Sequence, residues 1–294
     1  MRFVSYNIQY GFGRDGIYDL PRAIAAVADA DVIALQEVER NWPRTGHDDQ
    51  PELISKLLPR HYWVYGPAFD MDASTVGADG RVVNRRRQFG TMLLSRTPIL
   101  WSRLHLLPMR RVVWPLNTQN PALQGLIRTP SGPVRIFSIH LAHIGVEERL
   151  EQIDFLLAHH RRVPLEGGPW SGTDDEPGRN WSNGEPEPEA PLAAIWMGDF
   201  NSEPGSAEYG RIVGRNPYHE GAAYADGFTD AAVATGTDSL LLISHERILR
   251  GAAQKRRLDY CFVSGTLADR VRRTWVDSTA AGSDHLPVWT EVDL

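Results

Sequence analysis

The sequence predicts a layered α/β protein in which strands and helices alternate along the chain. Short, mostly apolar strands recur throughout, helices with one apolar face follow several of them, and polar residues stand where strands end. Strands that are apolar throughout must be covered on both faces, so helices are expected outside the sheets. The polar residues at the strand ends would then open onto one edge of the structure.

Composition fits one large domain or two ordinary ones, since 294 residues with 42% hydrophobic side chains can bury a substantial core. The single cysteine, Cys261, excludes an internal disulfide. The first residues read as a strand rather than as a leader, and no run of about 18 apolar residues is present. These features predict a soluble, cytoplasmic protein.

The formal net charge of −6 is concentrated in one segment, which we call the acidic segment, residues 164–191. It contains seven acidic residues and one arginine and so accounts for the whole net charge. With six prolines and five glycines, it predicts a disordered or loosely held insertion rather than a linker between domains. Basic clusters elsewhere are consistent with a phosphate-bearing substrate or with solvated surface. They are Arg81 with Arg85, Arg86 and Arg87; Arg110 with Arg111; and Lys255 with Arg256 and Arg257.

The first part of the chain predicts a strand, a helix and a second strand. Residues 2–7 show the alternating side-chain pattern of a strand that ends at Asn7, and a loop that contains several glycines follows. A helix is expected from Pro21 onward, since proline suits the first helical turn. Residues 31–37 then form a mostly apolar strand that ends at Glu37. Asn7 and Glu37 would therefore lie at one edge.

The middle of the chain predicts further strands separated by irregular segments. We expect a short helix at 53–58 and strands at 61–69, 90–95, 99–107, 123–128 and 134–140, the last of which ends at His140. Residues 70–87, rich in Asp, Gly and Arg, predict an exposed, mobile loop. Residues 110–120 show no assignable pattern.

The remaining elements follow from the same patterns. Apolar residues at helical spacing predict an amphipathic helix over 146–160, with His159 and His160 on its surface. A helix at 207–213 leads into a loop, and strands are expected at 258–263, 272–276 and 288–292.

The most informative single motif is Gly198, Asp199, Phe200 and Asn201, which follows a short apolar strand. Asp199 and Asn201 are two residues apart at a strand end, so their side chains point to the same side. Together they can share a metal, a water or a phosphate oxygen. Alone the motif is moderately specific, because Asx residues also form ordinary turns.

Taken as a set, the motifs resemble those of the endonuclease/exonuclease/phosphatase superfamily in order and spacing. The matching positions are Asn7; Gln36 and Glu37; Ser138, Ile139, His140 and Leu141; Gly198, Asp199, Phe200 and Asn201; Leu258, Asp259 and Tyr260; and Ser283, Asp284 and His285. The group includes deoxyribonuclease I-like nucleases, abasic-site endonucleases, inositol polyphosphate 5-phosphatases and neutral sphingomyelinases. The resemblance implies a single domain over residues 1–294, built as a four-layer α/β/β/α sandwich of two mixed, mostly antiparallel sheets.

The resemblance also implies a metal site. Glu37 is similar to the main metal ligand of the family, Asn7 lies beside it, and Asp284 is similar to the second carboxylate on the metal side. Such hard oxygen donors suit Mg²⁺ or Mn²⁺. A zinc site built on His143 is not supported, because no thiolate or further motif accompanies it.

The catalytic roles are carried over in the same way. Asp199 resembles the residue that orients or deprotonates the attacking water, and Asn201 the one that holds a phosphate oxygen. His285 with Asp259 resembles the histidine and its orienting acid, a pair that favours the imidazolium. His140 matches the position that touches the phosphate or the leaving oxygen. Such a site would neutralise the anion and align a water for in-line attack.

Substrate choice is less determined. Residues 138–141 followed by 148–153 resemble the bacterial metal-dependent hydrolase branch, which implies a phosphodiesterase or phosphatase for small or lipid-derived phosphoesters. The alternative is a DNA or RNA nuclease that uses residues 81–87 to contact the backbone. A non-catalytic binding module is disfavoured, because no motif carboxylate or histidine is missing. The family's phosphate-clamping arginine has no clear match, and Arg87 and Arg111 are the candidates for that role.

Overall fold

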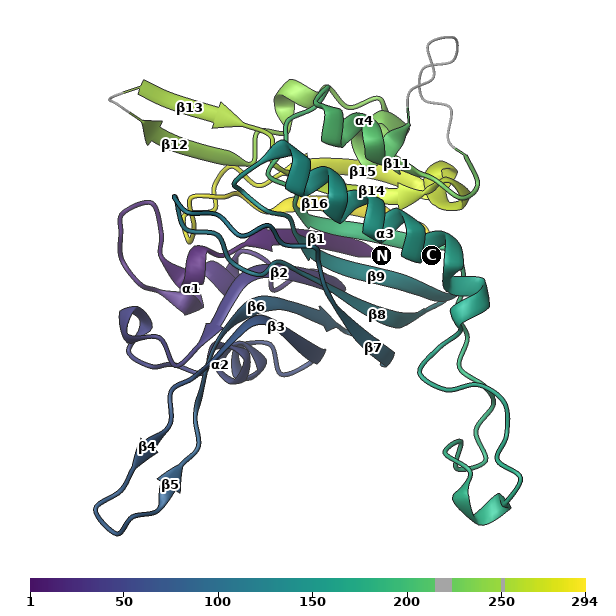
Figure 1. Cartoon of the computed structure of the whole chain (residues 1–294). Helices are drawn as coiled ribbons and strands as arrows, with labels where there is room; N and C mark the ends of the chain where they lie inside the picture. The colour runs from purple at the N-terminus through teal and green to yellow at the C-terminus, as the bar shows by residue number, and fades with distance from the viewer. Residues whose placement is uncertain (215–223, 250–251) are drawn as a thin grey trace.

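The computed structural model describes residues 1–214, 224–249 and 252–294, and it contains two six-stranded sheets with helices on their outer faces (Figure 1). Each sheet has one parallel strand pair within an otherwise antiparallel order. Helices, two sheets and helices make the four-layer α/β/β/α sandwich that the resemblance implied.

The first sheet has the strand order β15-β16-β1-β2-β6-β3. Its strands are β1 (Arg2–Asn7), β2 (Val32–Arg40), β3 (Tyr62–Asp72), β6 (Arg86–Ser95), β15 (Val271–Val276) and β16 (Val288–Val292). The parallel pair is β1 with β2, joined by a helical crossover.

The second sheet has the order β11-β14-β10-β9-β8-β7. Its strands are β7 (Ile99–Leu106), β8 (Pro121–Thr129), β9 (Gly132–His140), β10 (Ala194–Asp199), β11 (Phe228–Asp230) and β14 (Asp259–Ser264). Here β9 and β10 are the parallel pair, and the crossover between them contains the long helix.

Helices cover both outer faces. The helices are α1 (Leu20–Ala25), α2 (Gln50–Leu57), α3 (Val146–Glu166), α4 (Ala207–Val213) and α5 (Ala231–Thr235), with short 3₁₀ turns η1 (Gln9–Gly11), η2 (Pro43–Thr45), η3 (Pro177–Arg179), η4 (Ser239–Leu241) and η5 (Gly265–Arg270). Side-chain caps fix where several helices begin. Asp19 accepts a hydrogen bond from the backbone of Arg22 at α1, and Ser206 accepts one from Tyr209 at α4. Among the described residues, no helix combines the length and hydrophobicity needed to cross a membrane.

Three apolar layers hold the sandwich together. Phe3, Ala34 and Leu93 of the first sheet pack against Ile136 and Met197 of the second, all of them buried. Residues of α1 and α2 close the outer face of the first sheet, and residues of α3 and α4 close that of the second. The inner layer is apolar on both sides, which explains why the strands are apolar almost throughout.

Two hairpins extend from the body (Figure 1). Residues 70–87 are not the loop that we expected, because β3 and β6 continue pairing as far as Asp72 and Arg86 and end in β4 (Thr75–Val76) and β5 (Val82–Val83). An ion pair between Arg86 and Asp70, with N and O 2.9 Å apart, joins the two strands. The composition indicated exposure correctly, but the cross-strand pairing was not readable from it.

The segment after α4 contains more structure than the expected loop. Residues 215–223 lie outside the described residues, but β11, α5 and the hairpin of β12 (His245–Leu249) and β13 (Ala252–Arg256) follow. Residues 110–120 contain no helix or strand.

Helix α3 also differs from the prediction. It continues to Glu166, through Pro164, which occupies the last turn. His159 and His160 are buried, with 8% and 0% of their surface exposed, rather than on the surface. Both rings face the second sheet, where they find polar partners: Gln124 for His159 and Arg135 for His160. Beyond Glu166 the acidic segment is irregular except for η3. The expectation of one domain over residues 1–294 stays a prediction.

Candidate active site

The two parallel strand pairs deliver the polar residues to one edge of the sandwich. Asn7, at the end of β1, pairs with Gln36 of β2, and Asp199, at the end of β10, pairs with both His140 of β9 and Asp259 of β14. The two sheets meet directly at this edge, because Asn7 Nδ2 donates a hydrogen bond to Asp199 Oδ2 at 3.1 Å. Strand ends that are remote in sequence therefore form one site.

Close backbone contact between β9 and β10 supports this arrangement. A Cβ atom on Gly198 would lie 1.9 Å from the carbonyl oxygen of Ile139, its partner in the parallel ladder. Only glycine allows the two strands to approach in this way. The residues that follow on each strand, Asp199 and His140, are thereby held side by side.

Glu37 lies at a bulge rather than at the strand end that we expected. Strand β2 continues to Arg40, and its pairing with β6 shifts register between Gln36 and Val38. Glu37 itself has φ 60, a left-handed conformation that costs free energy in a non-glycine residue. The bulge turns the carboxylate into the site, where Glu37 Oε1 accepts a hydrogen bond from Asn7 Nδ2 at 3.1 Å. Burial raises the pKa of Glu37, and the charge of His140 opposes that shift.

His285 and Asp259 form a buried pair. His285 Nδ1 lies 2.8 Å from Asp259 Oδ2, which also accepts a hydrogen bond from Ser244 Oγ at 2.7 Å. Burial disfavours the charged imidazole, but the carboxylates of Asp259 and then Asp199 outweigh it and raise the pKa of His285 to about 10. His285 Nε2, 3.7 Å from Asp199 Oδ2, therefore carries a proton toward the pocket at neutral pH.

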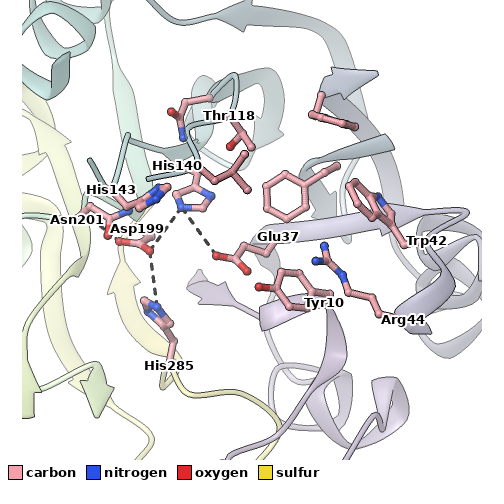
Figure 2. Close-up of a pocket in the computed structure, with 14 residues that line it drawn as sticks. Tyr10, Glu37, Trp42, Arg44, Thr118, His140, His143, Asp199, Asn201 and His285 are labelled. Carbon is pink, nitrogen blue, oxygen red and sulfur yellow. Dashed lines mark hydrogen bonds and ion pairs between the residues drawn. The ribbon is translucent and has the colours of Figure 1, made fainter. Parts of the chain in front are cut away.

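His140 completes the polar centre. Its Nε2 lies 3.7 Å from Asp199 Oδ2 and 4.0 Å from Glu37 Oε1 (Figure 2). Asn201, with φ 48, donates from its side chain to the carbonyl of Leu141 and from its backbone to Asp199 Oδ1, both at 2.9 Å. The amide of Asn201 thus ties the loop after β9 to the end of β10.

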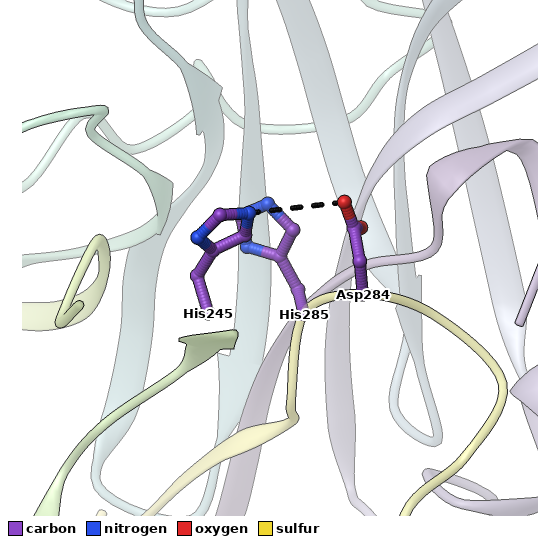
Figure 3. A group of neighbouring side chains, drawn as sticks. All are labelled: His245, Asp284 and His285. Carbon is purple, nitrogen blue, oxygen red and sulfur yellow. Dashed lines mark ion pairs between the residues drawn. The ribbon is translucent and has the colours of Figure 1, made fainter. Parts of the chain in front are cut away.

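Asp284 lies beside this centre, in an adjoining pocket that shares Tyr10 and Arg44 with the pocket around Asp199. Its Oδ2 accepts a hydrogen bond from Gln9 Nε2 at 3.0 Å and lies 3.8 Å from His245 Nε2 (Figure 3). His245 was missed by the sequence analysis, since it falls in the segment expected to be a loop. An isolated bridge to His285 positions it, and no local sequence pattern signals that long-range contact.

The residues present fit a divalent cation of the hard, oxygen-binding kind. Among the described residues, two groups bring three possible ligand atoms within 4.8 Å: Asp199, Asp259 and His285; and His245, Asp284 and His285. Neither group includes Glu37, the expected main ligand. Glu37 and Asp199 share the neutral amide of Asn7, and both lie within 4.0 Å of His140 Nε2, so a cation bound beside them would add to the compensation of their charge. Carboxylate and amide oxygens are the donors that Mg²⁺ and Mn²⁺ prefer.

The pocket above these residues, about 380 Å³ in volume, has two chemically different walls. The polar wall consists of Glu37, His140, His143, Asp199, Asn201 and His285. The aromatic wall consists of Tyr10, Trp42, Phe69, Phe89 and Leu116, with Arg44 against it. Figure 2 shows Glu37 between the imidazoles on one side and Trp42 and Arg44 on the other.

The arginine of the pocket is not one of those we expected. Arg87 does not line it, although its guanidinium carbon lies 5.6 Å from the centre of the Trp42 ring. Arg111 is exposed and does not line it either. Arg44 occupies the pocket instead, in a loop whose sequence carries no strand-end signal.

The site and the fold match one family. The family model for the endonuclease/exonuclease/phosphatase family matches residues 4–285, and the chain belongs to this family. Members of the family hydrolyse phosphoric esters with the help of divalent metal ions, and the chain is a phosphoric ester hydrolase.

Solved structures share the fold at low sequence identity. A Beutenbergia cavernae endonuclease/exonuclease/phosphatase protein has a TM-score of 0.62 and 19% identity, covering 100% of this chain and 71% of its own. A Bacteroides thetaiotaomicron mannosyl-6-phosphatase has a TM-score of 0.59 and 16% identity, with 100% of both chains covered. D. rerio TDP2, complexed with a single-strand DNA product, has a TM-score of 0.60 and 15% identity, covering 100% and 99%. A comparison with curated proteins found no match.

Proposed function

We propose that the protein is a divalent-metal-dependent phosphodiesterase or phosphatase that acts on a small or lipid-derived phosphoester by in-line attack of water. The observation that carries this proposal is the convergence of Asp199 Oδ2 with the Nε2 atoms of His140 and His285, each 3.7 Å away. A phosphoryl group at this point would meet a base and two imidazoles at once. The limited size of the pocket supports a small reacting group rather than a broad groove.

Each polar side chain has a role in the proposed reaction. Glu37 and Asn7, with Asp284 nearby, would hold Mg²⁺ or Mn²⁺, which neutralises phosphate charge when bound. Asp199 would orient the attacking water and accept its proton. His285, kept protonated by Asp259, would donate a hydrogen bond to a non-bridging oxygen, where negative charge accumulates.

His140 and Asn201 would act next to that oxygen. His140 Nε2 faces both Glu37 and Asp199, so it can donate to the phosphate or to the leaving oxygen. Asn201 would hold a phosphate oxygen, as the family resemblance implies, provided that its amide leaves the carbonyl of Leu141.

An activity screen tests the proposal. Wild-type protein is assayed with Mg²⁺, Mn²⁺ or EDTA on bis-p-nitrophenyl phosphate, p-nitrophenyl phosphate, supercoiled plasmid and an oligonucleotide. We expect metal-dependent release of p-nitrophenol that EDTA abolishes, with faster turnover of the small esters. Turnover that survives EDTA, or the absence of turnover on every substrate, would contradict the proposal.

A nuclease is the second candidate, favoured by one feature of the chain. The ribbon formed by β4 and β5 carries Arg81, Arg85 and Arg86, all exposed, although Arg81 and Arg86 are paired with Asp79 and Asp70. The DNA-bound D. rerio neighbour shows that the shared fold accommodates a nucleic-acid strand in that protein. Cleavage of plasmid or oligonucleotide, with binding that weakens steeply as salt is added, would favour this candidate.

A further inference from the structure

The aromatic wall begins next to the reacting centre. The Phe89 ring centre lies 6.4 Å from that of His140 and 6.2 Å from that of Tyr10, and Trp42 and Phe69 are 5.4 Å apart farther along. A group joined to the phosphorus through one ester oxygen would therefore reach these rings. Tyr10 itself has φ 50, so backbone strain is retained where its ring lines the pocket.

Arg44 is fixed against this wall. Its guanidinium carbon lies 3.8 Å from the Tyr10 ring centre and 4.6 Å from that of Trp42. Its Nε and Nη2 both donate to Glu39 Oε2, at 3.0 and 2.5 Å, and the Glu39 side chain is fully buried. Within the described part of the chain, Nη1 has no hydrogen-bond acceptor, while 39% of the Arg44 side chain is exposed. The guanidinium is thus preorganised, with donors still to be used.

We infer that the aromatic wall and Arg44 bind a polar ring, a nucleobase or a sugar, that the substrate carries on its phosphoester. This inference rests on the proposed function and specifies its substrate class. Aromatic faces stack on planar bases or on the C–H face of sugars. Acceptor atoms on the ring would satisfy Arg44 Nη1.

An acyl chain fits this wall less well. Only one of its five members, Leu116, is aliphatic, so the wall offers rigid ring faces rather than flexible side chains that adapt to an acyl chain. A chain lying on the wall would also cover the free donors of Arg44 without offering an acceptor, which is unfavourable, and more so for a charged donor than for a neutral one. The charge and the aromatic composition therefore both favour a ring.

A binding experiment tests this independently of turnover. The Asp199→Asn protein, with Mg²⁺ present to complete the site and turnover blocked, is titrated calorimetrically with adenosine 5′-monophosphate, glucose 6-phosphate and n-hexyl phosphate. We expect at least one of the two ring-bearing probes to bind ten-fold or more tightly than hexyl phosphate, a difference of about 1.4 kcal/mol. Comparison of the first two probes distinguishes a base from a sugar.

Variants of the aromatic wall and of Arg44 test whether these residues cause the preference for a ring. Added to the Asp199→Asn background, Trp42→Ala and Arg44→Gln should each reduce the preference to less than three-fold, with Trp42→Leu as a second variant that keeps apolar volume without a ring. Trp181→Ala, at an exposed tryptophan, and Arg40→Gln, at an arginine that pairs with Asp49 and stacks on Tyr65, are the matched controls and should keep it. Circular dichroism confirms that each variant is folded.

Several results would overturn the inference: hexyl phosphate binding as tightly as the rings, no binding of any probe, or a preference that survives the Trp42 and Arg44 variants. Failure of the proposed function gives a different pattern. In that case the Asp199→Asn protein still prefers the ring-bearing probes, and the Trp42 and Arg44 variants still lose that preference. Wild-type protein with Mg²⁺ or Mn²⁺, however, hydrolyses none of the three probes and none of the screened esters.

Discussion

Two buried polar clusters lie at opposite ends of the sandwich, and the protein compensates their charges in different ways. At the site end, Glu37, Asp199 and Asp259 bring three carboxylates together, and the compensating groups are imidazoles and one amide. At the other end, Arg135 is fully buried, and it donates to the carbonyls of Pro191 and Leu192 and to His160 Nδ1 at 2.7, 3.0 and 2.8 Å.

This difference indicates that the site cluster serves the proposed function, whereas the Arg135 cluster serves the stability of the fold. Carbonyl dipoles within the protein solvate the charge of Arg135, and the arginine holds His160 in its neutral, accepting form. Among the described residues, Arg135 Nη1 and His160 Nε2 have no hydrogen-bond partner. The site cluster keeps carboxylate charge beside a strained Glu37, and a bound divalent cation would balance that charge. Four perturbations, given in order of decreasing expected effect, test whether the two clusters differ in this way.

Removal of Glu37 should have the largest effect on activity. The Glu37→Ala variant loses the proposed main metal ligand, so we expect kcat/KM on bis-p-nitrophenyl phosphate to fall by about 10³-fold or more. The free energy of unfolding should not decrease, because the substitution also removes a buried charge. Activity within about ten-fold of wild type at saturating Mn²⁺ would refute the assigned role.

His285 should come next. The His285→Ala variant loses the protonated imidazole beside Asp199, and kcat should fall by about 10²-fold, the usual scale for one electrostatic or acid–base group. An exposed histidine, His47, provides the control, and His47→Asn should retain wild-type kcat. Equal kcat for both variants would show that the pair of His285 and Asp259 is not used in turnover.

The Arg135 cluster should affect stability and not activity. Burial, and then the charge of Arg135, lower the pKa of His160 to about 3, from 6.5 in the unfolded chain. Below about pH 6.5 only the unfolded chain takes up this proton, so the free energy of unfolding falls as pH drops toward 3.

The loss attributable to His160 is on the order of 3 kcal/mol between about pH 6.5 and pH 4.5. His160→Gln keeps an acceptor for Arg135 but does not titrate, so denaturant unfolding of this variant should show a shallower pH dependence than wild type and His47→Asn. An NMR titration of His160 with a midpoint near its ordinary value would contradict the assignment.

Shortening the acidic segment should have the smallest effect. A Cβ on Gly168 would lie 2.7 Å from Pro188, so the residues between them can be replaced by a short glycine-serine linker without moving the ends. The segment leaves the body at the opposite end from the site (Figure 1), and we expect kcat/KM to change by less than about three-fold. A larger loss, measured at matched metal concentration, would show that its charge or contacts reach the pocket.

Much of the polar wall could be predicted from sequence because His140, Asp199 and Asn201 stand at or just after the ends of strands. Apolar runs locate strands, strands of a layered fold end at common edges, and motifs such as Asp199 with Asn201 then mark the site. The same reasoning missed the bulge at Glu37, since one extra residue in a strand leaves no periodic signal.

The aromatic wall and His245 could not be predicted in this way. Trp42 and Arg44 lie in a loop, and His245 lies in a hairpin, so their positions depend on long-range packing rather than on local spacing. His159 and His160 were misplaced for a related reason. A helix buries a wider face when the sheet beneath it offers polar partners such as Gln124, and hydrophobicity alone does not reveal those partners.

Because Gly198 has no side chain, a substitution at this position could inactivate the enzyme without altering any group that touches substrate. A single methyl group there would act as a wedge between β9 and β10, forcing His140 away from Asp199. The spacing of Asp199 and His140 is therefore set by a backbone contact, one residue upstream of each side chain.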